Sequence, residues 1–176
     1  MAIVHVGDDD HLRYLLLGDV SVVLVGDEIK RVVSDQRINT TALAQRAEAD
    51  RLPYGSDAKS AAMVSMKQAE IAARNKPGGY WIAGADPAAV DHAITDSVPL
   101  SELSRIALLS DGAARAVDLF KVTDWAGVLD LLETSGPLEL IARVRSIELD
   151  DDDTTRWPRN KVSDDATAAY CDQLHA

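Results

Sequence analysis

The stretch LSRIALLSDG, residues 103–112, gives the clearest indication of how this chain folds. Residues 103–109 are mostly apolar, and the run stops abruptly at Ser110, Asp111 and Gly112. A short apolar run that ends in turn-forming residues is typical of a buried strand, and helical spacing begins directly afterwards. The stretch therefore predicts a strand that passes into a helix at a carboxylate.

The segments on either side continue this alternation of strand and helix patterns. Residues 3–6, 12–17 and 20–25 are β-branched or Leu-rich runs separated by Gly-Asp turns, which predicts a meander of short antiparallel strands. Helices are predicted at 39–52, 56–75, 86–93, 113–120, 124–133 and 137–149, and further strands at 80–83 and 166–171. We expect an α/β layered fold with an antiparallel sheet or sandwich flanked by helices.

Composition limits the partners that the chain can have. Its 176 residues, 47% apolar and 27% charged, are typical of a single globular domain spanning residues 1–176. The formal charge of −11 repels phosphate backbones and anionic lipid, so we expect neither nucleic acid nor a membrane as a partner. No apolar run approaches the roughly 18 residues of a membrane span, and no basic segment precedes one, so we expect a cytoplasmic protein.

Several catalytic and metal-binding patterns are excluded. Cys171 is followed by no arginine that could hold a phosphate, which excludes a cysteine-dependent phosphatase. The four histidines lack the spacing of zinc ligands. Residues 146–155 contain Asp-x-Asp-x-Thr twice, but the preceding segment is periodic as a helix. We therefore interpret these residues as a solvated acidic loop and not as an aspartyl-phosphate nucleophile.

Two carboxylates stand at strand boundaries and could carry chemistry. Asp111 follows the apolar run 103–109, and Asp164 precedes the strand predicted at 166–171. Carboxylates fixed in this way bind hard cations such as Mg²⁺ or Mn²⁺, with water completing the coordination shell. The residues alone fit a simpler interpretation as well, in which Asp111 caps the next helix and Asp164 begins a turn.

These motifs resemble those of the metal-dependent protein phosphatase 2C family. LLSDG at 108–112 resembles the family's SDG element, DDAT at 164–167 resembles its DNxT element, and YLLLGDVSVVL at 14–24 is similar to its GDS hairpin. The segments NKPGGYWIA at 75–83 and RWPRNK at 156–161 are similar to those of a bacterial, actinobacterial branch. The resemblance spans essentially the whole chain and implies the αββα architecture of that family.

The resemblance also implies a reaction and a set of ligands. In this family two divalent cations, Mn²⁺ or Mg²⁺, bridge a water or hydroxide that hydrolyses phosphoserine or phosphothreonine in proteins. By this resemblance Asp111 and Asp164 are metal ligands. Four further residues are implied to lie beside them: Asp19, Ser110, Gly112 and Asp165.

Three basic residues precede Asp164, namely Arg156, Arg159 and Lys161. Guanidinium and ammonium groups at this point could contact the phosphate of a substrate. They could equally balance the charge of the neighbouring acidic run. The sequence leaves both interpretations open.

The family's N-terminal portion has no counterpart in this sequence. That portion carries an acidic ED element, a phosphate-binding arginine and the DGxxG aspartate that bridges the two metals. Residues 8–10, all aspartate, do not replace it, because they form the solvated tip of a predicted hairpin. Two hypotheses follow: a metal-dependent phosphoserine/phosphothreonine phosphatase-like domain, or a non-catalytic interaction or regulatory module. The N-terminally incomplete sheet should also expose an unpaired edge through which two copies could dimerise.

Overall fold

The computed structural model describes residues 1–28 and 30–174. The strands are β1 (Ala2–Val6), β2 (His11–Leu16), β3 (Ser21–Val25), β4 (Lys30–Ser34), β5 (Ile94–Pro99), β6 (Arg105–Leu109) and β7 (Ala168–Cys171). The α-helices are α1 (Leu43–Asp50), α2 (Asp57–Ala73), α3 (Asp111–Asp118) and α4 (Trp125–Asp150). Short 3₁₀ turns are η1 (Arg37–Thr40), η2 (Pro87–His92) and η3 (Leu100–Glu102).

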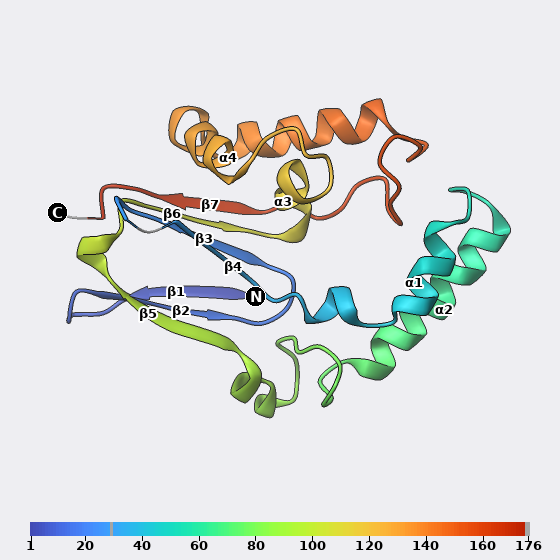
Figure 1. Ribbon diagram of the computed structural model, residues 1–176, viewed down its shortest axis with the longest axis horizontal. Coiled ribbons are helices and arrows are strands. Elements are labelled where there is room, and N and C mark those ends of the chain that lie inside the picture. Colours follow the sequence, from blue (N-terminus) through green and yellow to red (C-terminus); the bar gives the residue numbers. More distant parts are fainter. Residues whose placement is uncertain (29, 175–176) are drawn as a thin grey trace.

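The strands form two antiparallel sheets that stack on each other (Figure 1). One sheet has the strand order β1-β2-β5 and the other has the order β4-β3-β6-β7. Helices α3 and α4 cover the outer face of the larger sheet, and α1 and α2 lie beyond one end of the two sheets (Figure 1). The predicted α/β class, an antiparallel sandwich flanked by helices, is confirmed.

Two apolar clusters hold the layers together. Between the sheets, the alternating residues Leu12 and Leu16 of β2 meet Leu24 of β3, and all three side chains are fully buried. On the other face of β3, Val23 packs with residues of α4 such as Leu132. Strand β3 is therefore buried on both faces, which explains its continuous apolar sequence.

The connection between β2 and β3 differs from the predicted meander. The two strands belong to different sheets, so the predicted GDS hairpin does not form, and the chain crosses between the sheets at Gly18 and Asp19. Gly18 takes a φ of 81°, a conformation that glycine adopts at little cost. Strand β2 pairs with β1 and β5, whereas β3 pairs with β4 and β6, so both have their neighbours without each other.

Some of the other predicted helices and strands form as expected, and one strand does not. Helix α2 begins after Ser56, close to its predicted start, and the Ser56 side chain caps it by accepting a hydrogen bond from the Lys59 backbone N–H at 3.1 Å. The two helices predicted at 124–133 and 137–149 form the two halves of α4, joined at a kink where Gly136 has a φ of 80°. The strand predicted at 80–83 is wrong: only an isolated bridge forms there, between Arg74 and Tyr80.

Strand β1 is an open edge of the smaller sheet within the described part of the chain. Backbone bonds join Leu17 to Met1 and Gly7 to His11, each at 2.9 Å, and in an antiparallel ladder such pairs alternate with unbonded ones. The N–H and C=O groups of three residues therefore point away from β2: Ala2, Val4 and Val6. No helix within the described residues is long and apolar enough to cross a bilayer.

Candidate functional site

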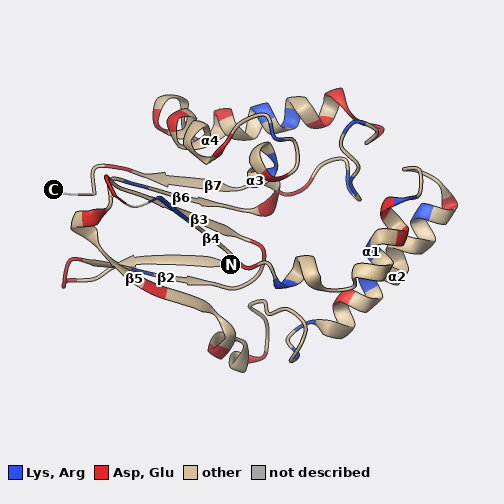
Figure 2. Ribbon diagram, in the orientation of Figure 1, with Lys and Arg blue, Asp and Glu red and all other residues tan. Residues whose placement is uncertain are grey.

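A cleft of about 820 Å³ opens between the end of the sandwich and helices α1 and α2. Its lining comes from the β2–β3 connection, the end of β4, α1, α2, α3 and the loop that leads into β7. Acidic residues gather at the strand ends that face α1 and α2 (Figure 2). The predicted site residues in this lining are Asp19, Asp111, Arg159, Lys161 and Asp164.

The pairing of β6 with β7 brings the two acidic motifs together. Leu109, the last residue of β6, lies opposite Ala168, the first residue of β7. Beyond that pair the Ser110 hydroxyl donates to the backbone carbonyl of Asp165 at 3.1 Å and accepts from the backbone N–H of Thr167 at 3.0 Å. Ser110 thus fastens the SDG segment to the DDAT segment, although more than fifty residues separate them in the chain.

Gly112 permits the close approach of these two segments. A Cβ atom at this position would lie 2.3 Å from the backbone carbonyl oxygen of Asp165 and 3.2 Å from that of Asp164. The first distance is far too short for any side chain. Glycine therefore fits here because the loop before β7 rests directly on the first turn of α3.

Asp111 lies in the first turn of α3, where the helix dipole favours a negative charge. Its carboxylate is accessible from the cleft and forms no ion pair with any described residue. Partial burial and the nearby negative charges of Asp19 and Asp164 raise the pKa of the Asp111 carboxyl. Asp19 and Asp164 therefore both lie within electrostatic reach of Asp111.

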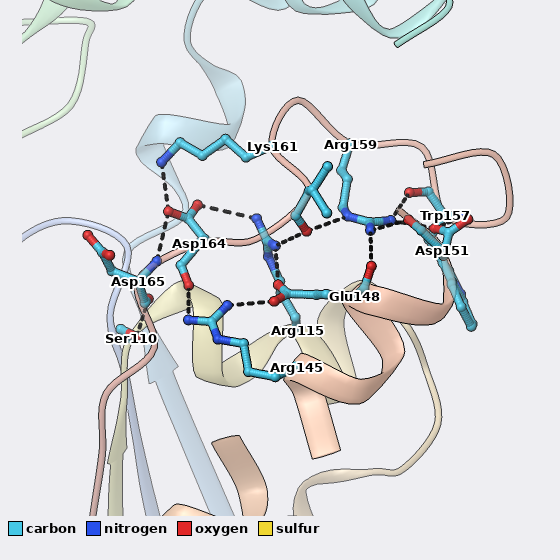
Figure 3. Close-up of polar contacts among 11 residues, drawn as sticks. Ser110, Arg115, Arg145, Glu148, Asp151, Trp157, Arg159, Lys161, Asp164 and Asp165 are labelled. Atoms are coloured by element: carbon cyan, nitrogen blue, oxygen red, sulfur yellow. Dashed lines mark hydrogen bonds and ion pairs between the residues drawn. The ribbon is translucent and has the colours of Figure 1, made fainter. Parts of the chain in front are cut away.

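Asp164 is held between two cations (Figure 3). Its Oδ1 accepts a hydrogen bond from Lys161 Nζ at 2.6 Å, and its Oδ2 accepts one from Arg115 Nη2 at 3.3 Å. Burial alone would raise the pKa of Asp164, but the hydrogen bond from Lys161 and the charge of Arg115 hold that pKa below its usual range. Both carboxylate oxygens of Asp164 thus have protein partners.

Arg115 is shared between Asp164 and a fully buried carboxylate, Glu148 on α4. Glu148 also accepts a hydrogen bond from Arg145, at 2.5 Å, and the backbone carbonyl of Val162 accepts one from Arg115 at 3.3 Å (Figure 3). A buried charge persists only when it is paired and hydrogen-bonded, so this network fixes the position of Arg115 beneath the cleft. This network was not predicted from the sequence.

Arg159 is buried, and all five of its N–H groups are engaged within its own region. They donate to the Asp151 carboxylate and to backbone carbonyls that include those of Trp157 and Val162 (Figure 3). No donor of Arg159 is therefore left for a phosphate. The interpretation of residues 146–155 as a solvated acidic loop is wrong for Asp151. This side chain is buried, and its carboxylate also accepts hydrogen bonds from two backbone N–H groups.

The remaining predicted residues lie at the margin of the cleft. Arg156 stacks over the ring of Trp157 at 4.1 Å and is absent from the cleft lining. Asp165 is exposed, and its backbone rather than its side chain makes the contact to Ser110. Lys161 is therefore the basic residue, of the three predicted, with a charged group in the cleft and an exposed side chain.

The donor set falls short of a two-metal centre. Within residues 1–28 and 30–174, no three His, Cys, Asp or Glu side chains form a group that could hold a metal ion. Asp111 forms no ion pair within the described part of the chain, whereas both carboxylate oxygens of Asp164 are engaged by Lys161 and Arg115. The residues present fit one weakly held hard cation, with water supplying most of its ligands.

Comparison with known proteins gives little further information. No model of a known protein family matches the sequence, and no curated protein matches it. Among solved structures, the fold is similar to a chain described as a C. elegans sex determining protein, with a TM-score of 0.45 and 10% sequence identity. The match covers 96% of this chain and 38% of that one, so this chain spans well under half the length of the other.

Proposed function

We propose that the cleft binds one divalent cation, Mn²⁺ or Mg²⁺, through Asp111 and Asp164. We further propose that the domain is a metal-dependent phosphoserine/phosphothreonine phosphatase-like domain of the 2C type. One observation carries this proposal: Asp19, Asp111 and Asp164 line a single open cleft, and Asp111 has no ion-pair partner there among the described residues. The resemblance of their sequence motifs to the SDG and DNxT elements agrees with it.

Like charges held close together favour a bound cation. Partial burial raises the pKa of Asp111, and the repulsion that its ionised form meets from Asp19 and Asp164 raises it further. A divalent cation between the carboxylates would remove that repulsion. Because few protein ligands are available, we expect a dissociation constant of about 10⁻³ M.

A cation in this position would supply a coordinated water of lowered pKa and would neutralise charge on a phosphoryl oxygen. The residues of the chain serve to orient the parts. The start of α3 fixes Asp111, and the Ser110 contacts fix the loop that carries Asp164. Arg115 and Lys161 add positive charge at the same end of the cleft, where a phosphate monoester would otherwise be repelled.

The second candidate function is a non-catalytic interaction or regulatory module. The observation that favours it is the pairing of both Asp164 oxygens with Lys161 and Arg115. Of the two predicted ligands, only Asp111 is then without an ion pair among the residues that the structure describes. A cleft that also contains apolar side chains, such as those of Met63 and Met66, could hold a peptide without hydrolysing it. Cation binding without turnover would identify this function.

The test compares two aspartates that line the same cleft, Asp111 and Asp118. Burial alone raises the pKa of Asp118, whereas Asp19 and Asp164 contribute to the raised pKa of Asp111. We expect Asp111→Asn to abolish Mn²⁺ binding, measured by the electron paramagnetic resonance signal of free Mn²⁺, and Asp118→Asn to preserve it. Phosphate release from a phosphoserine peptide should follow the same pattern.

Absence of Mn²⁺ binding by the unmodified chain would refute the proposal, as would equal binding by the unmodified chain and Asp111→Asn. Binding that depends on Asp111 but gives no metal-dependent phosphate release would refute the hydrolase and leave the interaction module. Circular dichroism of each variant establishes that the fold is retained.

A further inference from the structure

We propose that Lys161 is an exchangeable counter-ion: its ammonium group occupies Asp164 when no metal is bound, and it transfers to a phosphate group when a divalent cation takes Asp164. The inference deepens the proposed function and rests on it. It assigns to Lys161 a coupling between cation binding and phosphate binding in one cleft.

The geometry of the Lys161–Asp164 pair is that of a displaceable contact. The ammonium lies 2.6 Å from Asp164 Oδ1, yet the Lys161 side chain is 55% exposed while that of Asp164 is 16% exposed. The lysine thus reaches its partner from the solvent side, and its aliphatic stem can swing away without opening the core. Ion pairs with one partner this exposed contribute little to stability, so a divalent cation can compete for the carboxylate.

The second cation on Asp164 cannot exchange in the same way. Arg115 is only 12% exposed, pairs with the fully buried Glu148, and also donates to the carbonyl of Val162. The same guanidinium pairs with Asp164 and Glu148, so moving Arg115 away from Asp164 would leave part of the Glu148 charge uncompensated. Of these two partners of Asp164, both drawn in Figure 3, Lys161 is therefore the one that can exchange, whereas Arg115 is held by Glu148 and Val162.

The displaced ammonium remains in an environment that suits an anion once the cation is bound. A lysine side chain is protonated at neutral pH, so the displaced Lys161 ammonium keeps its charge. A divalent cation neutralises Asp111 and Asp164, and the ammonium then loses its main attraction to them. A phosphate group in the cleft becomes the strongest acceptor within its reach. Because coupling is reciprocal, phosphate must then also strengthen cation binding.

Lys67 provides a closely matched control. It lines the same cleft and pairs with Glu70 at 2.7 Å, with side-chain exposures of 57% and 5%. Glu70 also pairs with Arg46, just as Asp164 also pairs with Arg115. Removing the Lys67 charge therefore changes the cleft by the same amount, but away from Asp111 and Asp164.

The experiment measures Mn²⁺ binding by isothermal titration calorimetry, with and without sub-millimolar inorganic phosphate, and corrects for the Mn²⁺ that phosphate itself binds. Without phosphate, Lys161→Gln should bind Mn²⁺ roughly three to ten times more tightly than the unmodified chain, because a weak competing ion pair is lost. Phosphate should tighten Mn²⁺ binding about fivefold in the unmodified chain and in Lys67→Gln, and should have no effect in Lys161→Gln.

The possible results separate failure of the Lys161 exchange from failure of the cation site itself. Equal Mn²⁺ affinity in Lys161→Gln and the unmodified chain, or a phosphate effect that survives in Lys161→Gln, overturns the exchange while leaving the proposed cation site intact. If Lys67→Gln also loses the phosphate effect, that effect is a general consequence of positive charge in the cleft, and the proposed exchange of Lys161 is overturned. If neither the unmodified chain nor Lys161→Gln binds Mn²⁺, the proposed function fails and the exchange fails with it.

Discussion

Gly112→Ala adds a single methyl group where the SDG and DDAT segments are in closest contact, and it should push the two segments apart. The new Cβ would lie 2.3 Å from the backbone carbonyl oxygen of Asp165, so reaching even a 3.0 Å contact requires a displacement of about 0.7 Å. The obstacle is backbone and not the end of a flexible side chain. The loop carrying Asp164 must therefore move away from Asp111.

The expected size of the effect follows from two opposing contributions. Overpacking at a tight contact costs about 1–3 kcal/mol, whereas alanine in place of glycine in a helix recovers up to about 1 kcal/mol. We expect a net loss of about 1–2 kcal/mol in the free energy of unfolding. In a chain of this length that corresponds to a fall of about 2–8 °C in Tm.

Thermal denaturation followed by circular dichroism measures the stability change, and Mn²⁺ titration measures the site. Gly84→Ala is the control, because the nearest atom to a Cβ there is the Asn75 side-chain nitrogen at 3.8 Å. We expect Gly84→Ala to behave like the unmodified chain in both assays. A Gly112→Ala protein with unchanged Tm and unchanged Mn²⁺ affinity would show that the two motifs are not held together by this contact.

Three further perturbations test other parts of the structure. Glu148→Gln should lower the free energy of unfolding by about 3–5 kcal/mol, because it leaves Arg115 and Arg145 without their buried counter-charge. Glu139→Gln, at an exposed pair with Arg143, should change it by less than about 1 kcal/mol, and similar urea midpoints for the two variants would contradict the buried network. Because the pKa of Asp111 is raised in the folded state, its ionisation destabilises the fold above that pKa, and this penalty disappears as the pH falls below the usual carboxyl range. Asp111→Asn should thus raise Tm at neutral pH but not at low pH, and a gain that is independent of pH would argue against repulsion among the carboxylates. Finally, we propose that two copies of the chain pair through the open edge of β1, where the outward-pointing backbone groups belong to Ala2, Val4 and Val6. Ile3 is half exposed on that strand, and we expect Ile3→Lys to abolish the dimer, as measured by light scattering. If the unmodified chain is a monomer at all concentrations, the proposed pairing is refuted.

The local order of the elements around the site could be predicted because short-range patterns determine it. The apolar run before Ser110 forms β6, the helix follows at Asp111, and the closing strand forms beside β6. The strands β4 and β5 were not predicted. Each mixes charged or polar residues with few apolar ones, as Asp96 in the middle of β5 illustrates, so hydrophobic periodicity gives no signal there.

Asp19, Asp111 and Asp164 line one cleft, and their role as ligands stays a prediction. The partners of these residues could not be foreseen from the sequence. Glu148 finds Arg115 only through the packing of α4 against α3. One signal was present: Glu148 is four residues beyond Val144, which puts a carboxylate on the apolar face of a helix. A charge in that position requires a buried partner, and the sequence alone does not say which one.

The crossover between the two sheets at Gly18 and Asp19 also could not be predicted from the sequence. Two apolar strands joined by a short Gly-Asp turn suggest a hairpin, but β2 pairs with β5 and β3 pairs with β6, which lie about eighty to ninety residues further along the chain. Long-range pairing of this kind is decided by the burial of whole faces and not by the turn.

The helical hairpin formed by α1 and α2 has a small apolar core of its own, built around Ala49, Ala62 and Met66. It forms one wall of the cleft, while Asp111 and Asp164 stand on the opposite, sheet-anchored side. A pivot of this hairpin would widen or narrow the entrance and leave the carboxylates where they are. The width of the cleft and the position of its acidic residues are thus set by separate segments of the chain, so substitutions in one segment can alter the first without altering the second.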